Sequence, residues 1–181
     1  LRGGNASALL RLPDGSVFVY ITPSGAVKPR LSEESIAVMS LDGYTYWGRP
    51  SSEYRLHLEV YRRVPGARAV VHAHNPATVQ AARLELRLDP GLLGVEARYY
   101  LGGCVSRVPP LEPGTQQLAE AAAEALERCP AAVMEGHGAV AVGYAEDPVA
   151  AVYEAVDRLE ALEDLARAAL LEAQAGRRLG G

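Results

Sequence analysis

The 181-residue sequence is poor in several chemically informative residue types. Its only lysine is Lys28, its cysteines are Cys104 and Cys129, and its asparagines are Asn5 and Asn75. Two cysteines are too few for a disulfide scaffold. We therefore expect two reduced, partly buried thiols and a cytoplasmic protein, although one disulfide between the two cysteines stays open.

Long apolar runs and blocks of like charge are also missing. No apolar stretch approaches the roughly 18 residues of a transmembrane helix, and no block of five like charges occurs in a chain of net charge -4. These absences argue against a membrane span and a nucleic-acid partner. Hydrophobic residues make up 49% of the chain and charged residues 22%, as in ordinary globular proteins. The length predicts one domain, residues 1–181.

Apolar runs and turn residues predict the order of the secondary structure. Strands are expected at 8–12, 16–21, 36–41, 69–73, 95–101, 131–135 and 139–142. Helices are expected at 51–64, 75–84 and 115–128, with a last helix that starts at Asp147-Pro148 and ends before Gly176. The interspersed strands and helices predict an α/β fold, with helices packed on a central, partly antiparallel sheet.

Histidine is the residue type with a suggestive arrangement. His72 and His74 are two residues apart on a predicted strand, so their side chains point to the same face. His137 lies between Gly136 and Gly138, which allow a sharp turn. Three such imidazoles suit a catalytic zinc site, which takes three protein ligands and keeps one position open. The alternative is a set of surface or hydrogen-bonded core histidines.

The segment Ser51-Ser52-Glu53 opens a predicted helix. Its hydroxyls and free backbone N–H groups suit an anion such as phosphate, although plain helix capping explains the same residues. The turns at residues 3–5 and 24–25 are further small, polar segments that could meet the same anion. Glu53 could transfer a proton beside a metal. His57, four residues later, is expected to be a hydrogen-bonded structural residue.

These motifs follow one another in a specific order. They are Gly4-Asn5, Thr22-Pro23-Ser24-Gly25, Ser51-Ser52-Glu53-Tyr54-Arg55-Leu56-His57, His72-Ala73-His74 and Gly136-His137-Gly138. The ordered set resembles the class II aldolase/adducin family, most closely its L-fuculose-1-phosphate aldolase branch, over nearly the whole chain. The resemblance implies α/β/α layers around a central, largely antiparallel or mixed sheet. It also implies a helix before Gly4-Asn5, which is absent or not recorded here.

The resemblance also implies roles for individual residues. Glu53 would transfer a proton, and Tyr99 or Tyr100 of a neighbouring subunit would act as an acid, with Tyr100 preferred. The other implied roles are one zinc ion per subunit on His72, His74 and His137, and a substrate phosphate on Asn5, Ser24, Gly25, Ser51 and Ser52. Family members are typically homotetramers with active sites between subunits.

The expected activity is a zinc-dependent, reversible cleavage of a ketose 1-phosphate to dihydroxyacetone phosphate and an aldehyde. Lys28 lies in a predicted loop and is not placed for a Schiff base, so a metal must stabilise the developing charge. Alternatives within the family are a sugar-phosphate epimerase and a methylthioribulose-phosphate dehydratase at the same zinc site. A non-catalytic adducin-like assembly domain is the third alternative.

Overall fold

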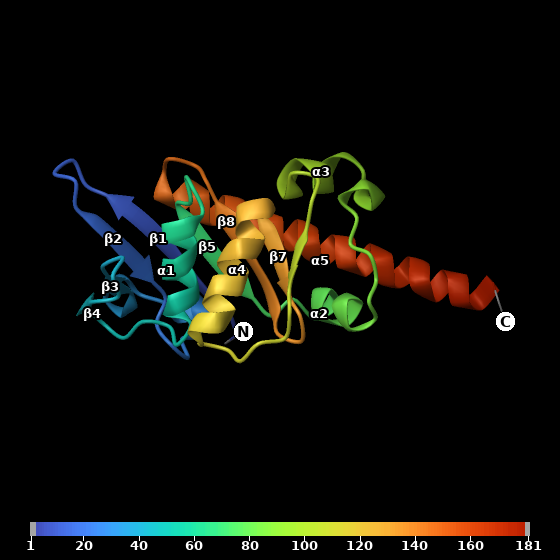
Figure 1. Ribbon diagram of the computed structural model, residues 1–181, viewed down its shortest axis with the longest axis horizontal. Coiled ribbons are helices and arrows are strands. Elements are labelled where there is room, and N and C mark those ends of the chain that lie inside the picture. The colour runs from blue at the N-terminus through green and yellow to red at the C-terminus, as the bar shows by residue number, and fades with distance from the viewer. Residues whose placement is uncertain (1–2, 180–181) are drawn as a thin grey trace.

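The computed structural model describes residues 3–179 and has a mixed sheet at its centre (Figure 1). The strand order is β4-β3-β2-β1-β5-β8-β7-β6. Only β6 and β7 pair in parallel among these neighbours. The strands are β1 (Asn5–Arg11), β2 (Val17–Ile21), β3 (Ala37–Met39), β4 (Thr45–Trp47), β5 (Ala69–Ala73), β6 (Ser106–Val108), β7 (Ala131–Met134) and β8 (Gly138–Gly143).

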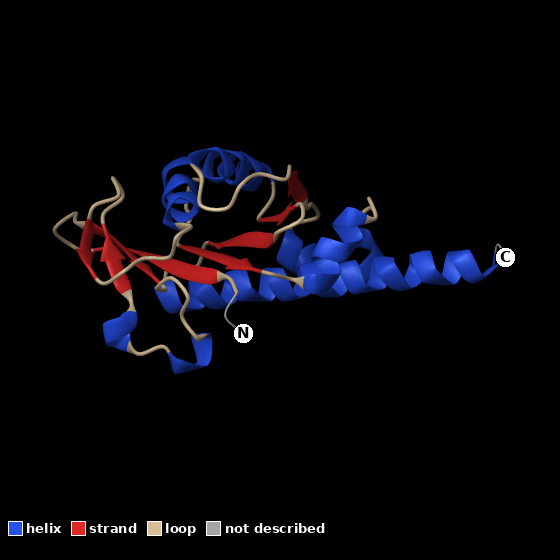
Figure 2. Cartoon of the chain, turned by 90° about the horizontal axis from the view of Figure 1, so that it is seen from below, coloured by secondary structure: helices blue, strands red, loops and turns tan. Residues whose placement is uncertain are grey.

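Helices cover both faces of this sheet and make three layers (Figure 2). They are α1 (Tyr54–Arg63), α2 (Pro76–Arg83), α3 (Val95–Leu101), α4 (Gln116–Arg128) and α5 (Pro148–Leu179), with short 3-10 turns at Lys28–Arg30, Glu33–Ser35 and Pro90–Leu93. Helices α1 and α4 lie on one face, and α2, α3 and α5 lie on the other (Figure 1). This arrangement confirms the predicted α/β/α fold.

The alternation of side chains along the strands divides the core into two parts. On β5, Val70 packs into the core under α1 and α4, whereas Val71 packs into the core under α5. Because side chains alternate along a strand, His72 shares the face of Val70. That face also receives Leu9 of β1 and Val60 of α1. His72 therefore lies between the sheet and α1.

The structure differs from the sequence-based expectation at residues 95–101, which form α3 and not a strand. Ala97 and Leu101 are four residues apart and buried, so they place one face of a helical turn against α5. Gly102 ends this helix in the left-handed conformation. The short strands β4 and β6 are not predicted from the sequence.

The last helix is also longer than expected, because α5 continues past Gly176 to Leu179. A glycine within an exposed helix costs only about 1 kcal/mol relative to alanine. Gly176 is exposed, with open space around it. The glycine therefore does not end the helix at this position.

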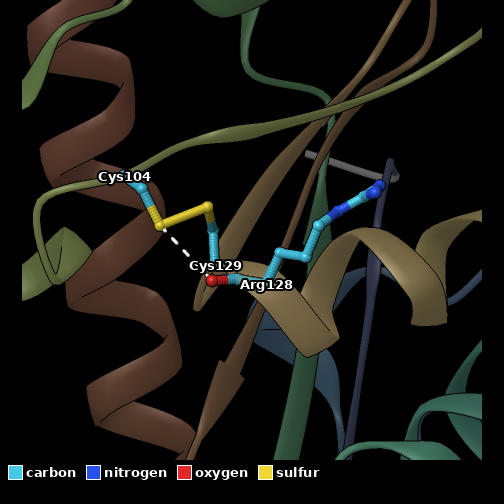
Figure 3. The surroundings of a disulfide bond; sticks show 3 residues. All are labelled: Cys104, Arg128 and Cys129. Atoms are coloured by element: carbon cyan, nitrogen blue, oxygen red, sulfur yellow. Dashed lines mark hydrogen bonds between the residues drawn. A yellow bond between two sulfur atoms is a disulfide. The ribbon is translucent and has the colours of Figure 1, made fainter.

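The expectation of two reduced thiols is wrong, because Cys104 and Cys129 form a disulfide (Figure 3). Cys129 is the C-cap of α4, and Cys104 follows α3 in the chain. Their Cα atoms are 5.6 Å apart, which is within the range that a disulfide spans. The bond ties the segment after α3 to the end of α4.

Within residues 3–179, no helix has the combination of length and apolar character that crossing a membrane requires.

Candidate active site

Three histidines meet at one end of the strands β5, β7 and β8. His72 is on β5, His74 follows that strand, and His137 lies in the turn between β7 and β8. One ligand atom from each ring lies within 4.8 Å of the others. A Cβ atom on Gly138 would be only 2.3 Å from the carbonyl oxygen of Ala73. Glycine at this position therefore allows the His137 turn to lie against β5.

The ring of His72 is held in one tautomer. Its Nδ1–H donates a hydrogen bond of 2.9 Å to the carbonyl oxygen of Ala139. Burial lowers the pKa of His72 to about 4, although the charge of Glu53 acts in the opposite direction. The neutral ring therefore carries a lone pair on Nε2, and this buried atom has no hydrogen-bond partner.

The carboxylate of Glu53 lies between two of these histidines. Its Oε2 atom is 3.4 Å from Nε2 of His72, and its Oε1 atom is 3.5 Å from Nε2 of His137. Burial also lowers the pKa of His137, which favours its neutral ring. The two contacts with Glu53 are therefore not ion pairs with charged imidazolium rings. A lone pair on His72 and a carboxylate oxygen that face each other repel, unless a cation lies near both.

The donors at this end of the sheet fit a divalent metal ion. The buried side-chain atoms that lack hydrogen-bond partners, among the described residues, include Oε1 of Glu53, Nε2 of His72 and Nδ1 of His137. Buried polar atoms normally have partners, so such a concentration at one place fits a cation-binding site. Imidazole nitrogens suit zinc and other first-row transition metals.

The structure also brings together two of the segments that are expected to bind phosphate. An isolated β-bridge between Pro23 and Pro50 places the Ser24-Gly25 turn beside the segment that leads into α1. Ser51 is buried and Ser52 is exposed. The hydroxyls and backbone N–H groups at the start of α1 therefore lie near the small, polar turn, as an anion site requires.

Asn5, which is expected to bind phosphate, is hydrogen-bonded to two other side chains. Its Nδ2 donates to Oε2 of Glu53 at 2.8 Å, and its Oδ1 accepts a hydrogen bond from Nε2 of His57. One hydrogen of the amide nitrogen remains for another acceptor. The backbone approach is tight here, because a Cβ on Gly4 would be 2.3 Å from the carbonyl oxygen of His72.

His57 is a buried residue with both ring nitrogens hydrogen-bonded, which agrees with the expected structural role. Its contact with Asn5 is not predicted from the sequence. The four-residue spacing of Glu53 and His57 was the available signal, because such residues share one face of a helix. Their common partner, Asn5 on β1, is 48 and 52 residues away in sequence, so no local sequence pattern predicts these contacts.

The candidate tyrosines do not join the histidines within one chain. Both lie on α3, at the other end of the strands from the turn between β7 and β8 (Figure 1). Tyr99 is 79% exposed. Tyr100 lines a pocket of about 270 Å³ together with acidic residues of α3 and α5: Glu96, Asp157, Glu160 and Asp164. Such acidic walls do not suit a phosphate group, so this pocket is not the expected phosphate site.

A larger pocket adjoins the histidine site. Its volume is about 470 Å³, and it is mostly apolar. Asn5, Thr22 and His72 contribute to its wall, together with Pro29 and Leu31. Ala6, Val71 and Ala73 also line it, and their side chains lie on the face of the sheet opposite to the His72 ring. Glu53, His74 and His137 are not among its lining residues.

Comparisons with known proteins find a family model and several relatives that this chain resembles. Residues 1–170 match the model of the family described as "Class II Aldolase and Adducin N-terminal domain". An L-fuculose phosphate aldolase from Methanococcus vannielii is 34% identical over 151 residues, which are 82% of this chain and 76% of the relative. A 3-oxo-tetronate 4-phosphate decarboxylase from Haemophilus influenzae is 30% identical over 169 residues, 91% of this chain and 76% of the relative.

A solved structure shows the same similarity in three dimensions. The crystal structure of L-fuculose-1-phosphate aldolase from Thermus thermophilus superimposes with a TM-score of 0.82 at 36% sequence identity. The match covers 99% of this chain and 87% of that structure.

Proposed function

Since the chain belongs to the class II aldolase and adducin family, we propose that it is a zinc-dependent aldolase for a ketose 1-phosphate. The reversible reaction yields dihydroxyacetone phosphate and an aldehyde such as lactaldehyde, and L-fuculose 1-phosphate is the first candidate substrate. The names of the relatives from Methanococcus vannielii and Thermus thermophilus support this choice.

The position of Glu53 is the observation that carries the proposal. One carboxylate oxygen is held by Asn5, while the other, Oε1, is buried and has no hydrogen-bond partner. Oε1 therefore makes no other hydrogen bond that would compete with an incoming proton. Oε1 is therefore available to take a proton from carbon beside the substrate carbonyl and to return it in the reverse reaction.

The phosphate end of the substrate would be held by the start of α1 and the turn beside it. The groups proposed to contact it are those of Ser24, Gly25, Ser51, Ser52 and the second amide hydrogen of Asn5. Anchoring the unreactive end of the substrate turns binding energy into orientation of the reacting carbon.

His72, His74 and His137 are the residues proposed to hold the zinc ion. When bound, the ion supplies a Lewis acid for the negative charge that develops on the ketone oxygen as the carbon–carbon bond breaks. The Ala139 carbonyl keeps His72 in the tautomer whose Nε2 faces this position.

The assembly that we propose is a cytoplasmic homotetramer of single domains, with active sites between subunits. Tyr100, or alternatively Tyr99, would reach the site of a neighbouring copy and act as an acid near the aldehyde oxygen. The exposure of Tyr99 on α3, away from the histidines of its own chain, is consistent with such a role.

The direct test is the release of dihydroxyacetone phosphate from a panel of ketose 1-phosphates. The protein is first treated with a chelator and then reconstituted with zinc. Release that requires zinc is the expected result, and the fastest substrate identifies the sugar. Absence of release from zinc-loaded protein would overturn the aldolase proposal.

A second candidate is the decarboxylation of a 3-oxo acid phosphate, because the relative from Haemophilus influenzae has this name. That reaction also leaves negative charge on a ketone oxygen, so the same metal and phosphate groups suit it. Release of carbon dioxide from 3-oxo-tetronate 4-phosphate, without cleavage of ketose phosphates, would favour it. Activity only in epimerase or dehydratase assays would indicate the other family reactions, and absence of bound metal would indicate an assembly domain.

A further inference from the structure

A continuous chain of side-chain hydrogen bonds runs from the interior of the protein to Glu53. The hydroxyl of Tyr61 lies 2.7 Å from Oγ of Ser7, and the same Oγ lies 2.7 Å from Nδ1 of His57. Nε2 of His57 is bonded to Oδ1 of Asn5, whose Nδ2 donates to Glu53. All five residues are buried, and His57 is 0% exposed.

This series of hydrogen bonds forms because the residues involved have similar spacings on one helix and one strand. Glu53, His57 and Tyr61 are four residues apart at α1, a rise of roughly 6 Å for each step. Asn5 and Ser7 are two residues apart on β1, a rise of roughly 6.6 Å. Because the two spacings are nearly equal, each strand residue fits between two helix residues and contacts both.

The chemistry of the groups sets the direction of every hydrogen bond. A carboxylate only accepts, so the amide nitrogen of Asn5 must face Glu53 and its oxygen must face His57. Nε2 of His57 must then carry the hydrogen. The neutral ring accepts on Nδ1 from the hydroxyl of Ser7, which in turn accepts from Tyr61.

The environment of His57 agrees with a neutral ring. Burial, and to a smaller extent the electrostatic interaction with His72, lowers the pKa of His57 to about 3. Burial also raises the pKa of Tyr61, so its phenol keeps the proton that it donates to Ser7. The four residues that lead to Glu53 in this series of hydrogen bonds are therefore uncharged at neutral pH.

We propose that His57 is a positioning residue that holds the Glu53 carboxylate through Asn5, while Ser7 and Tyr61 keep its ring in the required Nε2–H tautomer. With Oε2 held by Asn5, Oε1 of Glu53 is directed toward the histidine site. The expected effect on the rate rests on the proposed role of Glu53 in proton transfer. The expected tautomer of His57 does not depend on that role.

The tautomer is tested on the zinc-loaded protein by NMR of ¹⁵N-labelled histidine. Comparison with His57→Gln assigns the His57 signals. We expect a neutral ring with a slowly exchanging hydrogen on Nε2 and an unprotonated Nδ1. A hydrogen on Nδ1, in either a neutral or a charged ring, would overturn the proposal whatever reaction the protein catalyses.

The positioning role is tested by comparing His57→Leu with His57→Gln. Leucine removes the donor to Asn5, whereas the amide nitrogen of glutamine can replace Nε2. We expect His57→Leu to lower the rate of proton exchange into dihydroxyacetone phosphate by about 10–100-fold, the usual effect of losing a partner of a metal-site residue. KM and zinc content should stay near the wild-type values, and glutamine should restore much of the rate.

Val60→Ala is the matched control, because Val60 is fully buried on the same helix and lies outside the hydrogen-bond chain. It should lose stability but keep the wild-type rate at a temperature where it is folded. Equal rates for His57→Leu and wild type, or no advantage of glutamine over leucine, would overturn the positioning role. A wild-type protein that catalyses no exchange would instead contradict the proposed function, and the NMR result would stand.

Discussion

Oε1 of Glu53 lies 3.5 Å from Nε2 of His137 and has no hydrogen-bond partner, although it is buried. Two features of the sequence that are 84 residues apart, a helix start and a glycine-flanked turn, therefore meet at this atom. A buried carboxylate oxygen beside imidazole nitrogens suits both a cation and a proton-transfer reaction.

Glu53→Gln removes the basic oxygen but keeps the shape of the side chain. We expect the variant to retain zinc and to lose proton exchange into dihydroxyacetone phosphate by about 10²–10⁴-fold, the usual contribution of a general base. Exchange is measured by NMR in deuterated water. An unchanged exchange rate would remove Glu53 from proton transfer.

His72→Ala should lose bound metal and activity together, because it removes one of the three proposed metal ligands. Metal content is measured after gel filtration, and thermal unfolding is followed with and without added zinc. Wild type should gain about 2.7 kcal/mol of stability when free zinc is 100 times the Kd. His57→Gln should retain the metal and is the matched control. Full zinc binding by His72→Ala would show that the ligand assignment is wrong.

The stability of the metal-free protein should depend on pH through His57. The pKa of this residue is about 3 in the folded protein, against 6.5 for an unperturbed histidine. Between these values the unfolded chain binds a proton that the folded protein does not, so stability falls as pH decreases from about 6.5 toward about 3. The contribution to the slope is at most about 1.4 kcal/mol per pH unit.

Urea unfolding at several pH values between 5 and 7 checks this dependence. His57→Gln should have a shallower slope, because glutamine does not titrate in this range. The comparison uses slopes, so a constant loss of stability in the variant does not affect it. Identical slopes in the two proteins would contradict the assignment of a depressed pKa to His57.

Reduction of the disulfide should destabilise the protein, because Cys104 and Cys129 close a loop across 25 residues of sequence. We expect a loss of about 2–4 kcal/mol in the free energy of unfolding. The measurement is chemical unfolding with and without a thiol reductant. The double variant Cys104→Ser/Cys129→Ser should be insensitive to reductant, and equal reductant sensitivity of the two proteins would show that the bond is not responsible.

Mixed tetramers test whether a tyrosine acts across a subunit boundary. Tyr100→Phe and Glu53→Gln should each be poorly active alone. After dissociation and reassembly as an equal mixture, roughly a quarter of the sites in a ring should combine an intact Glu53 with an intact Tyr100 from the neighbour. Recovery of activity to that extent is the expected result. No recovery with Tyr100→Phe, but recovery with Tyr99→Phe, would transfer the role to Tyr99.

Much of the fold could be predicted because its main elements are specified locally. The β1–β2 hairpin follows from two apolar runs around a Pro-Asp-Gly turn, and α2 follows from Asn75-Pro76. The segment 95–101 was predicted wrongly because its apolar residues fit two periods in so short a stretch. The contact of Ala97 and Leu101 with α5 selected the helix.

Local chemistry in the sequence by itself determined which residues are candidates for the site. An H-x-H pair on a strand, a histidine between glycines and a carboxylate at a helix start are recognisable from residue type and spacing alone. Only the tertiary structure decided how they combine. The partners Asn5 and His57 of Glu53, the tautomer of His72 and the Cys104–Cys129 bond all depend on contacts between distant segments, which form when the sheet and α1 pack together.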